Sequence, residues 1–240
     1  MALILHIETA TSSTSVAISD NGKLLGLAER NEKNLHASVI TDLISEAVTG
    51  AGINLNQLNA ISVSKGPGSY TGLRIGVATA KGLCYGLEIP LIGINTLEAM
   101  SIGMLANLKS NDHLLINEPI FTVCPMIDAR RMEVYTARYN QSGKLTAGTR
   151  AMIIDENTFF EELASGPVVF FGDGSDKIKK LYDSYGNAYF HSNFLNSATF
   201  QIVPATSAFT MSQFEDLCSF EPYYLKEFFT TQAALKPKQN

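Results

Sequence analysis

"KGPGSYTGLRIGVATAKGLCYGL", residues 65–87, begins like a phosphate-binding loop and continues as a helix that is unusually rich in glycine. Four glycines, Gly72, Gly76, Gly82 and Gly86, lie inside this predicted helix. Each interior glycine destabilises a helix by roughly 1 kcal/mol relative to alanine. The pattern therefore indicates either an anion held at the start of the helix or a partner helix that approaches it closely.

The glycine turn at the start of this segment does not match the strict phosphate-binding fingerprints. A P-loop needs lysine followed by serine or threonine after its last glycine, but Gly72 is followed by leucine. A dinucleotide-binding turn needs a third glycine where Thr71 stands. The backbone amides of residues 69–71 can still hold an anion at the helix start. The simpler alternative is that residues 66–68 form the turn and Ser69 caps the helix.

The segments around this helix alternate between strand and helix patterns. Residues 3–30 predict a three-stranded meander, because the Asp-Asn-Gly between its later apolar runs is a strong hairpin signal. Apolar residues recur at helical spacing over residues 35–48. Short apolar runs at residues 60–65 and 89–95 predict buried strands on either side of the glycine-rich helix.

The second half of the chain repeats the opening pattern. Residues 121–153 again give an apolar strand that ends in an acid, a polar turn, a second strand, a turn and a third strand. Both copies contain Gly-Lys-Leu, at residues 22–24 and 143–145. A duplicated meander predicts two similar α/β lobes in tandem, residues 1–105 and 106–240, the second ending in a polar tail. Chance similarity between two hairpins is the alternative.

Several polar residues are candidates for a functional site. Glu8 and Asp128 end equivalent strands, the usual place for metal–phosphate chemistry in a two-lobed fold, and Thr9 is grouped with them as a candidate nucleotide contact. Alternatively, both acids accept backbone hydrogen bonds in the adjoining turns. "FFGDG", residues 170–174, predicts a turn that faces a nucleoside or simply a strand followed by a tight turn. His36 has no Ser or Cys triad and no zinc-binding pair beside it, so packing or capping is its simplest role.

Composition excludes some classes of function. The chain has 240 residues, 45% of them hydrophobic, and a net charge of −5. This acidity argues against a protein that binds nucleic acid mainly through its own surface. Its three cysteines fit no metal or redox spacing, and the opening apolar run is too short for a signal peptide. We therefore expect a cytoplasmic protein that does not enter the membrane.

Several segments together resemble the TsaB (YeaZ) family of bacterial tRNA threonylcarbamoyladenosine biosynthesis subunits, in the TsaD or glycoprotease-like branch of the actin-like ATPases. The resemblance extends over nearly the whole chain and is strongest in its first hundred residues. The segments that carry it are "IETATSSTSVAIS", "LHASVITDLI", "GPGSYTGLRIG", "MIDARRMEVYTARY" and "PYYLK". It implies two tandem actin-like lobes, each a mixed sheet with a meander flanked by helices. The second lobe is reduced, because the chain is shorter than the catalytic paralogue TsaD.

The resemblance also implies that the catalytic centre is lost. TsaD carries Asn-His-Met-Glu-Gly-His after the strand that follows the glycine-rich helix, and its two histidines hold a metal. In this chain the corresponding residues 95–100 read "NTLEAM", so Asn95 and Glu98 remain while Thr96 and Met100 replace the histidines. Neither replacement suits a divalent ion in that arrangement. We expect no metal, no catalytic residue and no intrinsic cofactor, with ATP or ADP at most at an interface with another subunit.

The resemblance implies a role for the glycines as well. In this family the two helices of the first lobe pack against the same two helices of TsaD. Gly72, Gly76 and Ala80 are spaced at i, i+4 and i+8, so they lie on one helix face that would admit a partner helix. The isolated chain is expected to form a homodimer through the same face. The candidate interface residues are His36, Ile40, Leu43, Gly72, Arg74, Gly76 and Ala80.

The implied function is that of a non-catalytic scaffold which binds and activates TsaD. The complex forms N6-threonylcarbamoyladenosine at position 37 of tRNAs that read ANN codons, with a TsaE-like ATPase as a further partner and tRNA reached only through the complex. One alternative is an ATP-dependent kinase of small metabolites, which the fold and the acids Glu8 and Asp128 favour. A weaker alternative is a peptidase, although no nucleophile or zinc site is recognisable.

Overall fold

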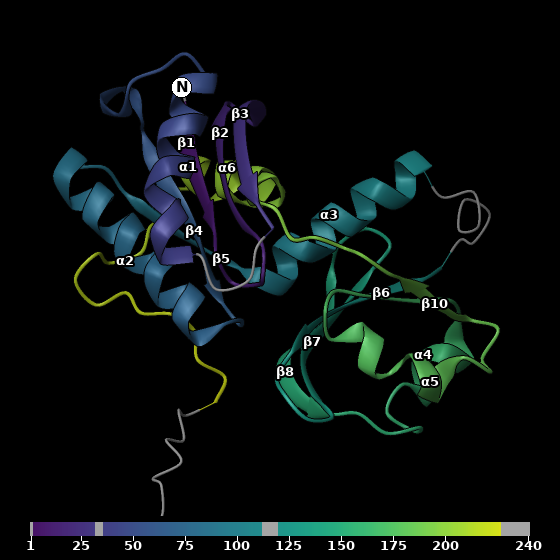
Figure 1. Ribbon diagram of the computed structural model, residues 1–240. Helices are drawn as coiled ribbons and strands as arrows, with labels where there is room; N and C mark the ends of the chain where they lie inside the picture. Colours follow the sequence, from purple (N-terminus) through teal and green to yellow (C-terminus); the bar gives the residue numbers. More distant parts are fainter. Residues whose placement is uncertain (1, 32–35, 112–119, 227–240) are drawn as a thin grey trace, which may run out of the picture.

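The computed structural model describes residues 2–31, 36–111 and 120–226, which form two lobes side by side (Figure 1). Each lobe is built on a mixed sheet of five strands. The strand order is β3-β2-β1-β4-β5 in the first sheet and β8-β7-β6-β9-β10 in the second. Because the same order occurs twice, the predicted duplication of an α/β lobe is confirmed.

The first lobe follows the predicted order of elements closely. In the turn between β2 and β3, Asn21 has φ 48° and Gly22 has φ 83°. A two-residue type I′ hairpin turn requires such positive φ values at both residues. The two helices α1 and α2 cover one face of the sheet (Figure 1). The elements are β1 (Leu3–Glu8), β2 (Thr14–Asp20), β3 (Lys23–Arg30), α1 (His36–Gly50), η1 (Leu55–Gln57), β4 (Ala60–Gly66), α2 (Tyr70–Leu87) and β5 (Leu91–Asn95).

The second lobe repeats the meander and has shorter helices. Strand β9 runs parallel to β6 and carries the buried sequence "VVFF". The elements are α3 (Thr96–Asn111), β6 (Thr122–Asp128), β7 (Glu133–Asn140), β8 (Leu145–Ile153), α4 (Phe160–Ser165), β9 (Val168–Phe171), η2 (Ser175–Lys177), α5 (Lys179–Tyr182) and β10 (Ala188–His191).

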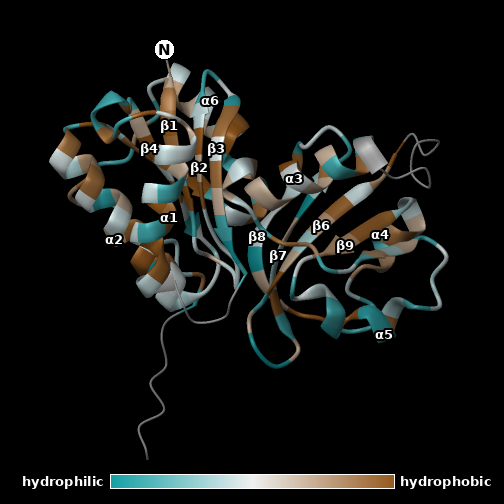
Figure 2. Cartoon of the chain, turned by 45° about the horizontal axis from the view of Figure 1, so that its top comes forward, coloured by the Kyte–Doolittle hydropathy of each residue, from teal (hydrophilic) through white to brown (hydrophobic). Residues whose placement is uncertain are grey.

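The cores of both lobes lie along their sheets, where hydrophobic residues are concentrated (Figure 2). Leu5 and Ile7 of β1 pack towards α1 and α2, whereas Ile4 belongs to the cluster on the opposite face. Helix α3 contributes to both lobes: Ala99 packs with the first-sheet cluster and Met104 with the second. The sheets are therefore joined through a shared helix as well as through the chain.

The segment after the second sheet returns to the first lobe. It contains η3 (Ala198–Gln201) and α6 (Ile202–Thr210), which cover the face of the first sheet opposite α1 and α2. Further along, the amide of Glu215 donates to the carbonyl of Leu91 at 2.9 Å. The prediction that all of residues 106–240 belong to the second lobe is therefore wrong for 197–226. The physical reason is that this sheet face carries polar groups that need hydrogen-bonding partners.

Candidate functional site

The start of α2 is capped as the simpler alternative predicts. The Ser69 hydroxyl accepts a hydrogen bond from the amide of Gly72 at 3.3 Å, and the amide of Ser69 itself donates to the carbonyl of Ala10 at 2.7 Å. This turn therefore packs directly against the segment that follows β1. Two amides at the helix start already have partners within the chain, so the turn serves packing and capping.

The glycines in the first half of α2 face inward. A Cβ atom added at Gly72 would overlap the carbonyl oxygen of Thr9, and one added at Gly76 would overlap Thr9 Oγ1. The Thr9 hydroxyl donates to the carbonyl of Gly72 at 2.8 Å, which holds the helix against the end of β1. Ala80, on the same face, is fully buried. The prediction that Gly72, Gly76 and Ala80 line a partner-binding face is therefore wrong, because this face packs within the first lobe.

Of the other candidate interface residues, some are buried in the first lobe and one is exposed at its surface. Ile40 and Leu43 are 4% and 1% exposed and belong to the core cluster of the first lobe, so their assignment to a partner surface is also wrong. His36 begins α1, but its side chain lies outside the described residues. Arg74 is exposed, with its guanidinium 5.3 Å from the Tyr70 ring centroid and Nη1 donating to the Tyr70 hydroxyl at 3.0 Å.

A different row of residues, small except for Arg74, lies on the solvent side of α2. Arg74, Ala78, Gly82 and Gly86 are exposed and recur every four residues, and we call them the outer face of α2. A Cβ atom added at Gly82 or Gly86 would meet no atom of the described residues within 4 Å. Beside them, Tyr85 is 81% exposed. The glycines that leave room for an approaching helix are therefore those in the second half of α2.

Glu8 is buried in the first lobe and fully engaged. Its Oε1 accepts from the amide of Ala10 at 2.7 Å, and its Oε2 accepts from the Ser64 hydroxyl and from Gln201 Nε2. Burial raises the pKa of Glu8, although these hydrogen bonds oppose the effect. The structure therefore supports the backbone-acceptor alternative and does not place Glu8 where a nucleotide could reach it. The hydroxyl of Thr9 likewise points to α2.

Glu8 belongs to a buried polar network that sequence patterns did not predict. His6 Nδ1 lies 2.7 Å from Ser62 Oγ, and His6 Nε2 lies 2.8 Å from Ser19 Oγ. The Ser62 hydroxyl donates to Gln201 Oε1 at 2.8 Å, and Gln201 Nε2 donates to the carbonyl of Ile7 at 2.8 Å. The signal in the sequence is that polar residues recur at i and i+2 in both β1 and β4. This pattern could not be interpreted from the sequence alone, because the residue that joins the two strands, Gln201, lies far away in the sequence.

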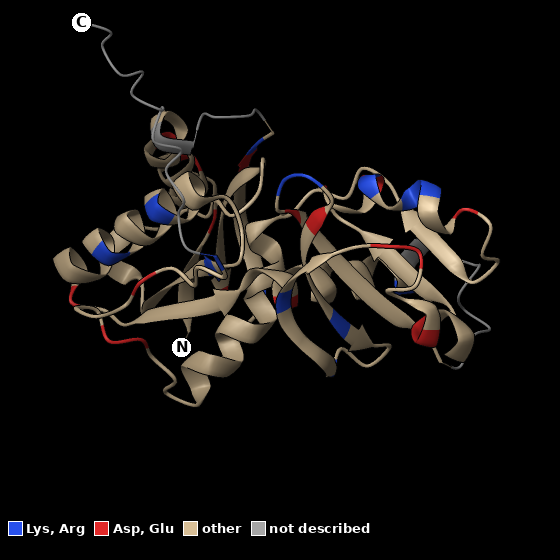
Figure 3. Cartoon of the chain, turned by 90° about the horizontal axis from the view of Figure 1, so that it is seen from below, with Lys and Arg blue, Asp and Glu red and all other residues tan. Residues whose placement is uncertain are grey.

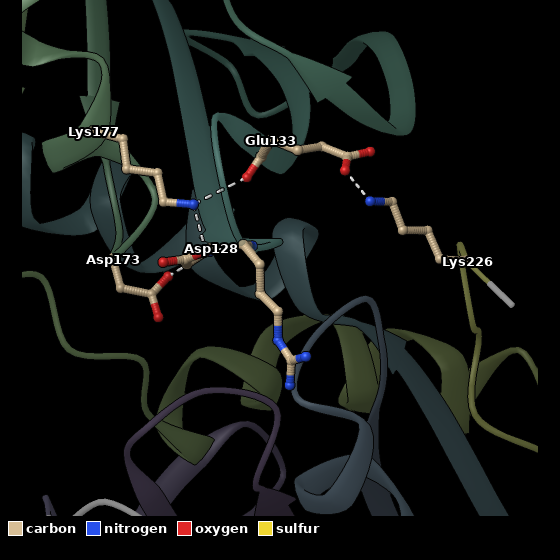
Figure 4. A network of polar contacts seen from close by, with 6 residues as sticks. Asp128, Glu133, Asp173, Lys177 and Lys226 are labelled. Carbon is tan, nitrogen blue, oxygen red and sulfur yellow. Dashed lines mark hydrogen bonds and ion pairs between the residues drawn. The ribbon is translucent and has the colours of Figure 1, made fainter. Parts of the chain in front are cut away.

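Asp128 ends β6 as predicted, but its carboxylate is already paired. Lys177 Nζ lies 2.5 Å from Asp128 Oδ1, which also accepts from the amide of Arg130 at 2.5 Å (Figure 4). The amide of Asp128 donates to Asp173 Oδ1 at 2.9 Å. Asp128 thus organises the turn after its strand, whereas Glu8 is covered by η3. The two acids do not form a shared catalytic pair.

A small hollow lies between the lobes, beside the turn after β9. Gly172, at φ 93°, and Asp173 belong to the "FFGDG" segment and form part of its wall. The described residues that line it are Thr11, Ser12, Ser13, Met100, Gly172, Asp173, Phe194, Leu195 and Asn196. Among the described residues, this lining contains no lysine, arginine or histidine, and none of the predicted nucleotide contacts. Nothing in this lining would neutralise the phosphates of a nucleotide.

The residues that replace the paralogue's histidines lie in the interior. Thr96 is fully buried at the start of α3, and Met100 is 1% exposed in the second-lobe core. Asn95 caps the helix by accepting from the amides of Leu97 and Glu98 at 2.9 and 3.2 Å. Among the residues that the structure describes, no group of three His, Cys, Asp or Glu side chains could hold a metal. The expected absence of a metal stays a prediction.

Comparisons with known proteins identify relatives of this chain. The family model for TsaD, tRNA N6-adenosine threonylcarbamoyltransferase, matches residues 23–234. The protein TsaB of Escherichia coli is 36% identical over 138 residues, or 58% of this chain and 55% of that protein. TsaB of Bacillus subtilis is 29% identical over 187 residues, covering 71% and 75% of the two chains. The match to the E. coli relative thus spans little more than half of its length.

A solved structure gives the same fold. YeaZ from Pseudomonas aeruginosa superposes with a TM-score of 0.77 at 22% sequence identity, covering 94% of this chain and all of that one. The resemblance and the tandem lobes inferred from the sequence are therefore confirmed. In the described part of the chain, no helix combines the length and the apolar character needed to span a membrane.

Proposed function

Because the chain belongs to the family of TsaD, tRNA N6-adenosine threonylcarbamoyltransferase, we propose that it acts in tRNA threonylcarbamoyladenosine biosynthesis as a non-catalytic subunit. It binds and activates a TsaD-type paralogue in the complex that modifies position 37 of tRNAs reading ANN codons. The TsaB name of its relatives supports the pathway. The observation that carries the non-catalytic role is the burial of Thr96 and Met100 where the paralogue has metal-binding histidines.

We place the partner surface on the outer face of α2 together with the exposed side of α1. The open space above Gly82 and Gly86 allows a helix backbone to approach, and Arg74 and Tyr85 supply side chains of the types that are enriched in interfaces. Without the paralogue, the same surface pairs two copies of this chain. A TsaE-like ATPase joins the complex in the cytoplasm, and any ATP or ADP lies at an interface between subunits.

The substitution Gly82→Leu tests this surface. A leucine there separates the two helix axes, so we expect at least a hundredfold loss of affinity for the paralogue, about 3 kcal/mol. The monomer should melt at a slightly higher temperature than the wild type, because leucine favours the helix over glycine and the added Cβ atom meets no described atom within 4 Å. Calorimetric titration with the paralogue measures the affinity, and light scattering shows whether the homodimer is lost.

Gly186→Leu is the matched control, because Gly186 is also exposed with open space around it but lies in the second lobe. It should leave binding unchanged. Wild-type affinity in the Gly82→Leu variant would refute this placement of the surface. A wild-type chain that does not pair with the paralogue would refute the proposed function itself.

A further inference from the structure

The turn between β6 and β7 contains two consecutive arginines in a left-handed backbone conformation. Arg130 has φ 69° and Arg131 has φ 51°. Left-handed conformations are disfavoured for residues with a Cβ atom, and turns that need two in succession usually use asparagine and glycine. Arginines at these two positions therefore cost backbone energy that asparagine and glycine would avoid.

The two acidic residues that flank the arginines in the hairpin are already paired with lysines, whereas Asp173, beside Asp128, forms no ion pair with any described residue. Asp128 pairs with Lys177 of η2 on one side, and Glu133 pairs with Lys226 of the C-terminal segment on the other (Figure 4). The amide of Glu133 also donates to the carbonyl of Arg130 at 3.2 Å, which closes the turn. The hairpin is thus fixed in place from both lobes, and its own carboxylates are held by lysines.

Both arginine side chains remain available to an external group. Arg130 and Arg131 are exposed, and neither forms an ion pair with any residue in the described ranges. By contrast, Arg138 is paired with Glu162 at 2.8 Å. Two consecutive exposed arginines on one turn suit an anionic chain, because each guanidinium can bind phosphate oxygens through two parallel hydrogen bonds.

We propose that the Arg130–Arg131 turn binds the phosphodiester backbone of RNA; the choice of tRNA as the ligand rests on the proposed function. Elsewhere lysines and arginines are interspersed with acids over both lobes (Figure 3), and the net charge is −5. A contact confined to one turn gives weak binding to the isolated chain and becomes effective when a partner holds the same RNA.

The double variant R130N/R131G tests this assignment. Asparagine and glycine suit the left-handed turn, so we expect a higher melting temperature together with weaker RNA binding. In the complex with the TsaD-type paralogue, affinity for tRNA should fall at least tenfold. The slope of log affinity against log salt should become shallower by about two, one for each lost phosphate contact. Fluorescence anisotropy at several salt concentrations measures both quantities.

Two controls separate the arginine turn from general charge effects. K179Q/K180Q removes the same charge from α5, where both lysines are exposed, and should change affinity less than twofold. R130K/R131K keeps the positive charge but cannot form two parallel hydrogen bonds to one phosphate. Its affinity for tRNA should therefore lie between those of the wild type and R130N/R131G.

Unchanged tRNA affinity in R130N/R131G would overturn the proposal, as would an equal loss in K179Q/K180Q. Pairing with the paralogue is measured separately, without RNA. If the wild-type chain pairs but R130N/R131G binds tRNA normally, only the arginine assignment fails. If the chain does not pair, the proposed function fails, and the same titration on the chain alone still decides whether the arginines bind RNA.

Discussion

At Gly76, the backbone of α2 passes directly over the Thr9 hydroxyl. A methyl group added at Gly76 would overlap Thr9 Oγ1, and Thr9 is fixed by its own hydrogen bond to the carbonyl of Gly72. Helix propensity and packing therefore act in opposite directions at this residue. Propensity alone would favour alanine by roughly 1 kcal/mol, whereas overpacking of a fixed contact costs about 1–3 kcal/mol.

We predict that Gly76→Ala lowers the free energy of unfolding while Gly82→Ala raises it. Urea denaturation of the two variants measures the difference in sign. Adding Thr9→Ala to Gly76→Ala removes the overlapping oxygen and should recover part of the loss, so the two substitutions are not additive. An equal increase in stability for Gly76→Ala and Gly82→Ala would show that α2 does not press on Thr9.

Residue spacing alone could not assign the glycines correctly. The inner set, Gly72, Gly76 and Ala80, and the outer set, which includes Gly82 and Gly86, both follow i, i+4 spacing. Such spacing shows that residues share a face but not which face meets the sheet. The closeness of α2 to Thr9 comes from the parallel pairing of β1 with β4, a long-range contact.

At the scale of elements, η3 provides polar groups that complete the first sheet. Gln201 is fully buried and bonds to the carbonyl of Ile7, to Ser62, to Ser64 and to Glu8. Its amide thus reaches the central strand β1 and the neighbouring strand β4. Removing it takes away the acceptor of the buried Ser62 hydroxyl and one donor each from the Ile7 carbonyl, Ser64 and Glu8, and a buried polar group that loses its partner costs about 1–3 kcal/mol.

We predict that Gln201→Met destabilises the chain by roughly 2–4 kcal/mol, although methionine has a similar volume. Differential scanning calorimetry should show a lower melting temperature. Gln213→Met is the matched control, because Gln213 is exposed, and its melting temperature should stay within about 2 °C of the wild type. Equal melting temperatures for both variants would indicate that η3 does not stabilise the sheet.

The meanders were predicted well because hairpin signals are local, as the left-handed Asn21–Gly22 turn shows. The role of Glu8 was not resolved because its environment is formed by Gln201, 193 residues away. The left-handed Arg130–Arg131 turn was also missed, since its sequence lacks the asparagine or glycine that normally marks such a conformation. Local sequence patterns therefore predict helices, strands and turns, whereas the burial of a given side chain depends on segments that are distant in the sequence.

At the scale of the whole molecule, the buried network makes stability depend on pH. Burial lowers the pKa of His6 to about 3. The Ser62 hydroxyl donates to Gln201, so it accepts from His6 Nδ1, and Ser19 donates to Nε2. The network therefore fits the neutral imidazole. Between pH 6.5 and about 3, the unfolded chain binds a proton that the folded chain does not, so stability falls as the pH is lowered.

We predict that His6 makes the free energy of unfolding fall by up to about 1.4 kcal/mol for each unit by which the pH is lowered below pH 6. Urea denaturation at pH 7, 6, 5 and 4 measures the slope. The His6→Gln variant has no titrating side chain at residue 6. The slope of its free energy of unfolding against pH should be smaller by that amount, even if the variant is less stable at pH 7. Parallel slopes for the two proteins would exclude His6 as the origin.

The return of residues 197–226 to the first lobe has a consequence for biosynthesis. Strand β5 ends at Asn95 and η3 begins at Ala198, so about 100 residues must be translated between them. At typical elongation rates this takes roughly 5–20 s. During this interval the nascent first sheet has one face uncovered, with His6 and Glu8 lacking the glutamine that later reaches them. The lobe that is translated first therefore cannot complete its folding until after the second lobe has been synthesised.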